Sequence, residues 1–274
     1  MAVLNPGWNI PRRFVLYRDE ATPSLKVDEI AVFLGEALGV TVKVKGDFLR
    51  ACFRGDREEL AERIANNRVS DLTKPFMAAE PAYGEIAYEL RLLEDPGKKA
   101  HGVLYDSRRM MALMRDLIPA KERTTDVQHI VFTSRLVGTF GEDGRYHAHV
   151  NICGYPAIIS TSGIVEAPAK PKEYYVLKRR FMEAGEAVPF ELLNERFAKQ
   201  FIDYDDPRLS EVLKGYALQC AMYAITNAPF CRNRGCRLFN AHWQSELIEA
   251  QLHGDRFCKK HRGMLTAIRR ASGS

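Results

Sequence analysis

Cysteine and histidine side chains gather near the C-terminus at spacings that suit a metal ion. Cys231 and Cys236 are separated by four residues, and after a spacer of 21 residues Cys258 and His261 are separated by two. Two close pairs joined by a longer loop can surround one ion tetrahedrally, because each pair holds it from a tight turn. Thiolate and imidazole ligands suit zinc better than calcium or magnesium. The spacing therefore predicts one structural zinc ion.

Basic residues flank these ligands: Arg232, Arg234, Arg237, Lys259, Lys260 and Arg262. Their positive charge would offset the negative charge of three thiolates and help to keep the thiols deprotonated. The alternative is a set of ordinary buried thiols and a surface histidine. Four ligand-type residues within 31 positions favour the metal site.

A second pair of potential ligands occurs at His147 and His149, which face the same side of a strand when they are two residues apart. Asp143, Glu166 or Cys153 could assist them. The alternative is two solvent-facing histidines on an edge strand, which we favour because no third ligand has suitable spacing.

Cys220 could act as a nucleophile if His147 or His149 served as its base. It lies on the apolar face of a helical pattern, where a cysteine is usually inert filling. We therefore expect packing there rather than catalysis.

The flanking patterns predict alternating strands and helices. Residues 14–18 and the alternating segment 40–46 predict strands, and 26–39 predicts a helix that ends at Gly39. Further helices are predicted over 56–67, with Asp56 as N-cap, and over 107–118, with Ser107 as cap.

The second half of the chain contains three predicted strands, at 129–137, 145–152 and 156–165. Residues 173–200 predict two helical pieces that divide near Gly185 and Pro189, and a long helix begins at Asp206-Pro207. Strands alternating with helices predict an α/β fold (α+β in the looser sense), with a mixed sheet covered by helices.

Composition limits the functional classes only loosely. Of the 274 residues, 46% are hydrophobic and 27% charged, and the net charge is +5. No stretch has the roughly 18 apolar residues of a membrane span, and residues 1–13 lack a signal peptide's apolar run. We expect a cytoplasmic protein with no membrane partner. The basic tail 259–274 leaves RNA or ribosome binding open.

The region from the last helix onward resembles the archaemetzincins, which are zinc metallopeptidases. In that family the helix HExxHxxGxxH runs into Cys-x4-Cys, and a later FCxxC completes a structural zinc site. FCRNRGC (230–236) and FCKKH (257–261) stand at the corresponding places, with His261 at the last cysteine. The segment 129–175 also resembles a small archaeal group labelled as metallopeptidases. The resemblance implies a zincin-like α/β body over 1–230 and a zinc-stapled subdomain over 231–274.

The catalytic pattern of that family is lost in this chain. Cys220, Ala224 and Phe230 stand where the resemblance places the three histidines, Ala221 replaces the glutamate and Asn227 the glycine. Peptidase chemistry needs those histidines to hold zinc and the glutamate to take a proton from zinc-bound water. We therefore predict a pseudoenzyme with a closed, dry cleft beneath the strand 156–165 and with Phe230 packed against the helix.

Three functions remain open from the sequence. The first is a binding protein with one structural zinc, which takes an unknown protein or peptide along an accessible strand edge at Ser160, Thr161 and Ser162. The second is a zinc metallopeptidase that uses the non-standard ligands His147 and His149. The third is an RNA- or ribosome-associated factor.

Overall fold

A five-stranded sheet lies at the centre of the molecule. The computed structural model describes residues 7–253 and 257–273. In spatial order the sheet contains β2 (Thr41–Asp47), β1 (Arg13–Arg18), β4 (Val127–Thr133), β8 (Ala157–Ser160) and β7 (Asn151–Ile152). The first four strands are parallel and β7 is antiparallel to β8. The predicted mixed α/β sheet is thereby confirmed.

A second, smaller sheet branches off the first. It consists of β3 (Leu104–Asp106), β5 (Leu136–Phe140) and β6 (Tyr146–His149). The prediction of single strands at 129–137 and 145–152 is therefore wrong, because each segment divides between the two sheets. The first division falls at Ser134 and Arg135, whose carbonyl oxygens accept hydrogen bonds from Ser162 and Ser160 at 2.6 and 2.8 Å. Periodicity alone cannot detect a polar turn whose partners are so distant in sequence.

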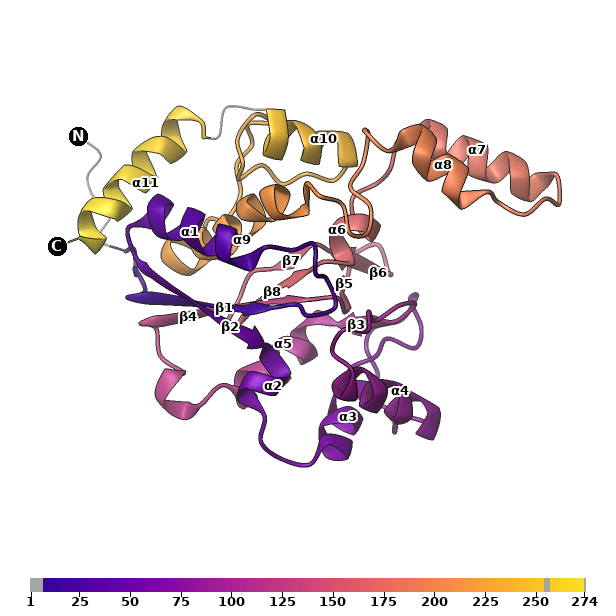
Figure 1. Ribbon diagram of the computed structural model, residues 1–274, viewed down its shortest axis with the longest axis horizontal. Helices are drawn as coiled ribbons and strands as arrows, with labels where there is room; N and C mark the ends of the chain where they lie inside the picture. The colour runs from indigo at the N-terminus through magenta and orange to yellow at the C-terminus, as the bar shows by residue number, and fades with distance from the viewer. Residues whose placement is uncertain (1–6, 254–256, 274) are drawn as a thin grey trace.

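Helices cover both faces of the main sheet, as Figure 1 shows. One face carries α1 (Val27–Leu38), α9 (Leu209–Thr226) and α11 (Lys259–Ser272), and the other carries α2 (Phe48–Cys52), α3 (Arg57–Ala65) and α5 (Ser107–Leu117). Alternation along β1 accounts for this, since Phe14 and Leu16 join the first core and Val15 and Tyr17 the second. Leu265 and Ile268 of α11 share the first core, so packing continues across the predicted boundary at residue 230.

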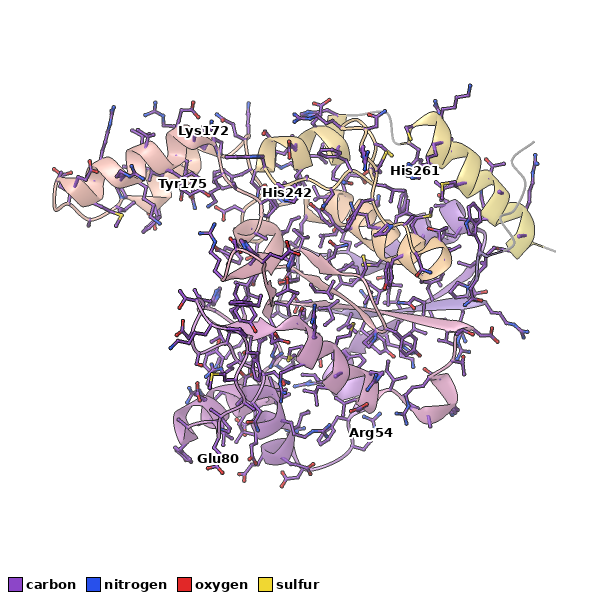
Figure 2. The ribbon with its side chains drawn as sticks, turned by 180° about the vertical axis from the view of Figure 1, so that it is seen from behind. Arg54, Glu80, Lys172, Tyr175, His242 and His261 are labelled. Atoms are coloured by element: carbon purple, nitrogen blue, oxygen red, sulfur yellow. The ribbon has the colours of Figure 1, made fainter. Side chains whose placement is uncertain are left out.

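The remaining helices lie at the periphery. They are α4 (Tyr83–Glu94), η1 (Ala120–Glu122), α6 (Gly163–Glu166), α10 (Gln244–Ile248) and η2 (Glu249–His253). An arm formed by α7 (Lys172–Glu183) and α8 (Phe190–Phe197) projects from the body (Figure 1), and Figure 2 labels Lys172 and Tyr175 on it. The division of this segment near Gly185 and Pro189 is as predicted, and the arm has a small core of its own around Tyr174, Leu193, Phe197 and Phe201.

Local capping signals were mostly reliable guides. Gly39 ends α1 with φ of 71°, and Asp56 caps α3 by accepting a hydrogen bond from the backbone N–H of Glu58. Asp106 rather than the predicted Ser107 caps α5, through the N–H of Arg109. The helix predicted from Asp206 begins at Leu209, after a turn in which Asp206 binds Arg208.

Within the described residues no helix has both the length and the apolarity needed to cross a bilayer. The expectation about the N-terminal segment falls partly on residues 1–6, which are outside the described residues.

Candidate metal centre

The turn after α9 positions the first cysteine pair. Asn227 ends the helix in the left-handed region with φ of 56°, and its N–H donates to the carbonyl of Tyr223. The chain then turns so that the N–H of Cys231 donates to Leu238 at 2.7 Å, while Cys236 closes a turn onto Asn233. This small loop places both sulfur atoms on the same side.

The start of α11 supplies the second pair. Cys258 is the N-cap residue and His261 lies in the first turn, so both side chains are on the same face of the helix. His261 is only 2% exposed and lies beside the loops that precede the helix (Figure 2). Leu265 and Ile268 fix the rest of α11 against the core, which orients the pair.

The four side chains converge as a tetrahedral site requires. One ligand atom from each of Cys231, Cys236, Cys258 and His261 lies within 4.8 Å of all the others. The Sγ atoms of Cys231 and Cys258 are 3.9 Å apart, and Nδ1 of His261 is 3.6 Å from Sγ of Cys236. Ideal zinc–ligand bonds at tetrahedral angles give about 3.8 Å between two sulfurs and about 3.6 Å between sulfur and nitrogen. The geometry is therefore compatible with one zinc ion.

The electrostatics of this cluster also suit a metal. Burial alone would raise the pKa of Cys258, but the backbone N–H groups of His261 and Lys260 and the neighbouring thiols lower it. Burial raises the pKa of Cys236 to about 12, so that thiol needs a cation to lose its proton. Burial and the charge of Lys260 lower the pKa of His261, which favours the neutral imidazole that binds zinc.

The surrounding basic residues play less uniform parts than predicted. Arg237 is buried and binds Glu211 and the carbonyl of Gln251, and Arg234 pairs with Glu246 at 3.1 Å. Both are therefore committed to carboxylates in the neighbouring elements. Lys259, Lys260 and Arg262 are exposed at the start of α11, so nucleic-acid binding there stays a prediction.

The two histidines of β6 form hydrogen bonds with different residues and do not converge on one metal site. Nε2 of His147 is 2.7 Å from Oδ1 of Asp143, and Nε2 of His149 is 2.7 Å from Oγ1 of Thr139. Burial chiefly lowers the pKa of His149, with smaller contributions from His147 and His242. Among the described residues, only the C-terminal cluster brings three or more histidine, cysteine or carboxylate ligands within coordinating distance.

The prediction of a peptide-binding strand edge at residues 160–162 is wrong. Ser160, Thr161 and Ser162 are all buried, and β8, which ends at Ser160, lies between β4 and β7 rather than at an edge. Thr161 donates to Asp19 at 2.7 Å, and the other two hydroxyls donate to backbone carbonyls of the β4–β5 turn. These polar side chains serve the interior, because they follow β8 into the junction of the two sheets.

The helix that corresponds to the archaemetzincin pattern is partly filled and partly open. Cys220 and Ala221 are fully buried, as expected of core residues. Phe230 is 44% exposed, so the prediction that it packs against the helix is wrong. It lies beyond the αL turn at Asn227, which directs the chain away from the core.

A cavity of about 560 Å³ opens over the C-terminal half of α9. No residue of 156–165 lines it, so the closed cleft expected beneath that segment stays a prediction. Tyr223, Ala224 and Asn227 form its helical side, and Cys153 and Tyr155 lie opposite. Its remaining lining is largely polar or flexible: Asn9, Pro11, Met111, Arg123, Thr124, Thr125, Gln128 and Gly154. This space could hold a small ligand or part of a peptide. We refer to it as the α9 pocket.

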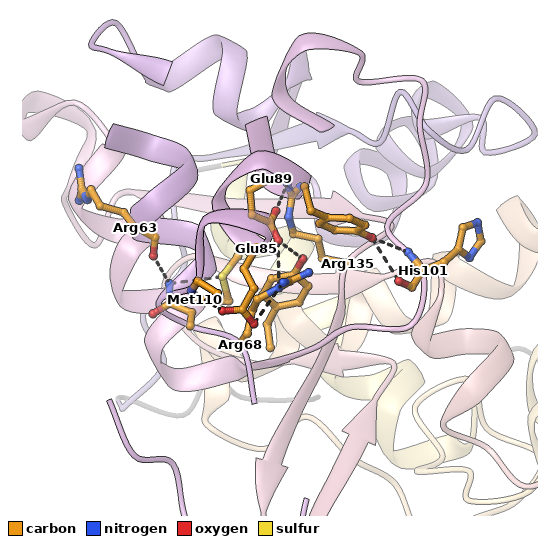
Figure 3. Close-up of polar contacts among 11 residues, drawn as sticks. Arg63, Arg68, Glu85, Glu89, His101, Met110 and Arg135 are labelled. Atoms are coloured by element: carbon orange, nitrogen blue, oxygen red, sulfur yellow. Dashed lines mark hydrogen bonds and ion pairs between the residues drawn. The ribbon is translucent and has the colours of Figure 1, made fainter. Parts of the chain in front are cut away.

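Sequence reasoning missed a buried polar network around Glu89, which Figure 3 displays. Glu89 is fully buried; its carboxylate accepts hydrogen bonds from Tyr105 at 2.5 Å and Arg135 at 3.0 Å, and Arg68 lies 3.5 Å away. Burial raises the pKa of Tyr105. The network joins α4 to the two sheets and is a structural feature. No sequence signal marks it, since its members are far apart in the chain.

Comparison with known proteins places the chain in context. A family described as "Probable metallopeptidase family (DUF6775)" matches residues 10–268. No curated protein matches the sequence.

Two solved structures are similar. One is a zinc-dependent peptidase from Methanocorpusculum labreanum, 12% identical, covering 92% of this chain and 99% of that one, with a TM-score of 0.44. The other is an archaemetzincin from Methanopyrus kandleri, 15% identical, covering 97% and 99%, with a TM-score of 0.40. At these scores neither structure defines the chemistry of this chain.

Proposed function

Because the chain belongs to the probable metallopeptidase family, we propose that it is a member stabilised by one structural zinc ion and that it binds peptides without cleaving them. One observation carries this proposal: the α9 pocket is open, but none of the described residues that line it is a histidine, aspartate or glutamate. Ala224 and Asn227 line the pocket where the archaemetzincin pattern has a histidine and a glycine. Cys220 and Ala221, at the positions of a histidine and the glutamate, are fully buried.

The structural role of the zinc follows from its position. The ion would join the turn after α9 to the first turn of α11, which are far apart in sequence. All four proposed ligands come from the protein, so a tetrahedral ion would have no coordination position left for water or substrate. A zinc ion held in this way stabilises the fold and does not activate water.

Peptide is the ligand class that family membership favours, and the lining of the α9 pocket is compatible with it. Thr124, Thr125 and Gln128 offer hydroxyl and amide groups for a backbone, and Tyr155 and Tyr223 offer apolar surface. The pocket is open enough for one or two residues of an extended chain, which would bind weakly and transiently.

The test exposes the zinc-loaded protein to a mixed peptide library and analyses both retained and cleaved peptides by mass spectrometry. We expect retention without cleavage. Ala224→Trp should fill the α9 pocket and abolish retention, whereas Val32→Trp, a change at a 60% exposed position of α1, should not. Equal retention by the wild type and Ala224→Trp would contradict the proposed binding site.

The second candidate is a zinc peptidase that uses His147 and His149. The observation in its favour is that the charges of His147 and His242, after burial, help to lower the pKa of His149. Against it, both β6 histidines already have hydrogen-bond partners, Asp143 and Thr139. Chelator-sensitive cleavage that disappears in a His147→Ala/His149→Ala double variant would establish this candidate and overturn the first.

A further inference from the structure

Two cysteines outside the C-terminal cluster meet beneath the α9 pocket. Cys153 follows β7, and Cys220 projects from α9. The side-chain amide of Asn151 donates to both sulfur atoms at 3.6 Å, so the two thiols share one donor. We call Cys153 and Cys220 the thiol pair.

The two thiols differ in access. Cys220 is fully buried, so no dissolved molecule reaches its sulfur. Cys153 is half-buried and lines the α9 pocket, so a small molecule in the pocket can approach it. This combination of one reachable thiol and one protected thiol beside the same amide is what a two-step thiol oxidation requires.

The surroundings of the pair act on the protonation of Cys220 and on the position of Asn151. The neighbouring Cys153 thiol and burial raise the pKa of Cys220, which favours its protonated form. Asn151 is further fixed by donating to Oε1 of Gln219 at 3.2 Å, and Gln219 in turn donates to the carbonyl of Phe239. The amide is therefore held in place beside both sulfur atoms.

We propose that Cys153 and Cys220 form a redox-active dithiol, which a small hydroperoxide entering the α9 pocket oxidises to a disulfide. This site is separate from the metal centre and does not depend on the proposed peptide binding.

The proposed reaction has two balanced steps. Cys153, as thiolate, attacks the terminal peroxide oxygen; an S–O bond forms, the O–O bond breaks, and the leaving oxygen takes up the proton that Cys153 lost. The products are a sulfenic acid and water or an alcohol. The sulfur of Cys220 then displaces the hydroxyl from Cys153, and that hydroxyl leaves as water with the Cys220 proton. Two thiols lose two electrons and two protons, and the peroxide gains them; a low-molecular-weight thiol would restore the pair.

The oxidised pair would change the pocket itself. A disulfide between Cys153 and Cys220 would tie the segment after β7 to α9, across the floor of the α9 pocket. The side-chain amide of Asn151, which now donates to both thiol sulfur atoms, would face a disulfide instead. The shape of the pocket would thus depend on the redox state.

The test treats the full-length, zinc-loaded protein with hydrogen peroxide or cumene hydroperoxide at a few equivalents, and then alkylates the remaining thiols. Mass spectrometry of the digest identifies cross-linked peptides, while a chromogenic chelator follows zinc release. We expect a Cys153–Cys220 disulfide to form before zinc is released. Zinc release that precedes this cross-link, or no cross-link at all, would overturn the proposal.

Variants assign the order of the two steps. Cys220→Ser should leave a sulfenic acid on Cys153 that a dione reagent traps, and Cys220→Ala serves if the serine disturbs the buried site. Cys153→Ser should slow the loss of thiols to peroxide about tenfold. Cys52→Ser is the matched control, since Cys52 is a half-buried thiol elsewhere, beside Tyr17. An oxidation rate unchanged by Cys153→Ser, or slowed equally by Cys52→Ser, would contradict the assignment.

Discussion

The C-terminal cluster (Cys231, Cys236, Cys258 and His261) and the thiol pair contain the same reactive atoms in contrasting surroundings. In the cluster, four ligand atoms converge, and backbone N–H groups lower the pKa of Cys258. In the thiol pair, burial and the partner thiol raise the pKa of Cys220, and one amide serves both sulfurs. The comparison shows that the number of ligands and the direction of nearby hydrogen bonds, rather than the presence of cysteine, determine whether a site suits a cation.

Removing a ligand from the C-terminal cluster should have the largest effect in this comparison. Cys236→Ser or Cys258→Ser should abolish zinc binding and lower the free energy of unfolding by about 3–5 kcal/mol, part of the 10–16 kcal/mol typical of zinc-dependent small domains. The loss is partial because Leu265 and Ile268 still anchor α11 in the core. Zinc content and denaturant unfolding measure both effects.

The matched control for this loss is Cys153→Ser, which removes a thiol from the pair but no ligand from the cluster. It should retain full zinc content. Zinc bound equally by wild type, Cys236→Ser and Cys258→Ser would remove the distinction between the two sites.

Introducing metal ligands at Cys220 and at three neighbouring positions should have the next largest effect on stability. The combined change Cys220→His, Ala221→Glu, Ala224→His and Phe230→His restores the three histidines and the glutamate of the catalytic pattern, while Asn227 still stands in place of its glycine. It inserts bulk and charge where Cys220 and Ala221 are fully buried. Overpacking and an unpaired carboxylate should cost about 2–5 kcal/mol and give no peptidase. Unfolding midpoints and casein hydrolysis test this.

Phe230→His alone is the control for that variant. Because Phe230 is 44% exposed, the single change should alter stability by no more than about 0.5 kcal/mol. A stable fourfold variant that binds a second zinc ion and cleaves casein would mean that the α9 site was never converted to core.

Acidification should have the smallest effect of the three changes, and it should release zinc from the C-terminal cluster without affecting the thiol pair. Lowering the pH from about 8 to about 5 adds protons that compete with zinc for the thiolates and imidazole of the cluster, so zinc should be released. Cys220 should not respond, because its raised pKa keeps it protonated throughout that range. A chromogenic chelator measures the released zinc, and alkylation after unfolding in acid counts the free thiols. If all the zinc stayed bound at pH 5, the assignment of thiolate ligands would be contradicted.

Much of the local structure and the C-terminal cluster could be predicted because their signals are close together in sequence. Gly39 and Asp56 set helix ends within one turn, and Cys231–Cys236 and Cys258–His261 are short-range pairs. Such features depend on neighbouring backbone geometry, which periodicity and capping chemistry capture.

The failed predictions involve partners far apart in the chain. Ser160 and Ser162 look like exposed strand residues until the turn at Ser134 and Arg135 supplies their acceptors. Glu89, for which the sequence made no prediction, is buried because Arg135 reaches it from the β4–β5 junction. Phe230 looked like core because it is apolar, but the αL turn at Asn227 directs it outward. None of these outcomes follows from the residue type alone.

The most direct test of this account is the zinc X-ray absorption spectrum of the purified full-length protein, normalised to zinc per chain. The account predicts one zinc ion per chain with three sulfur neighbours at about 2.3 Å and one nitrogen neighbour at about 2.0 Å. Two zinc ions per chain, or a single ion coordinated by nitrogen and oxygen without sulfur, would contradict it and would place the metal at a hydrolytic site instead.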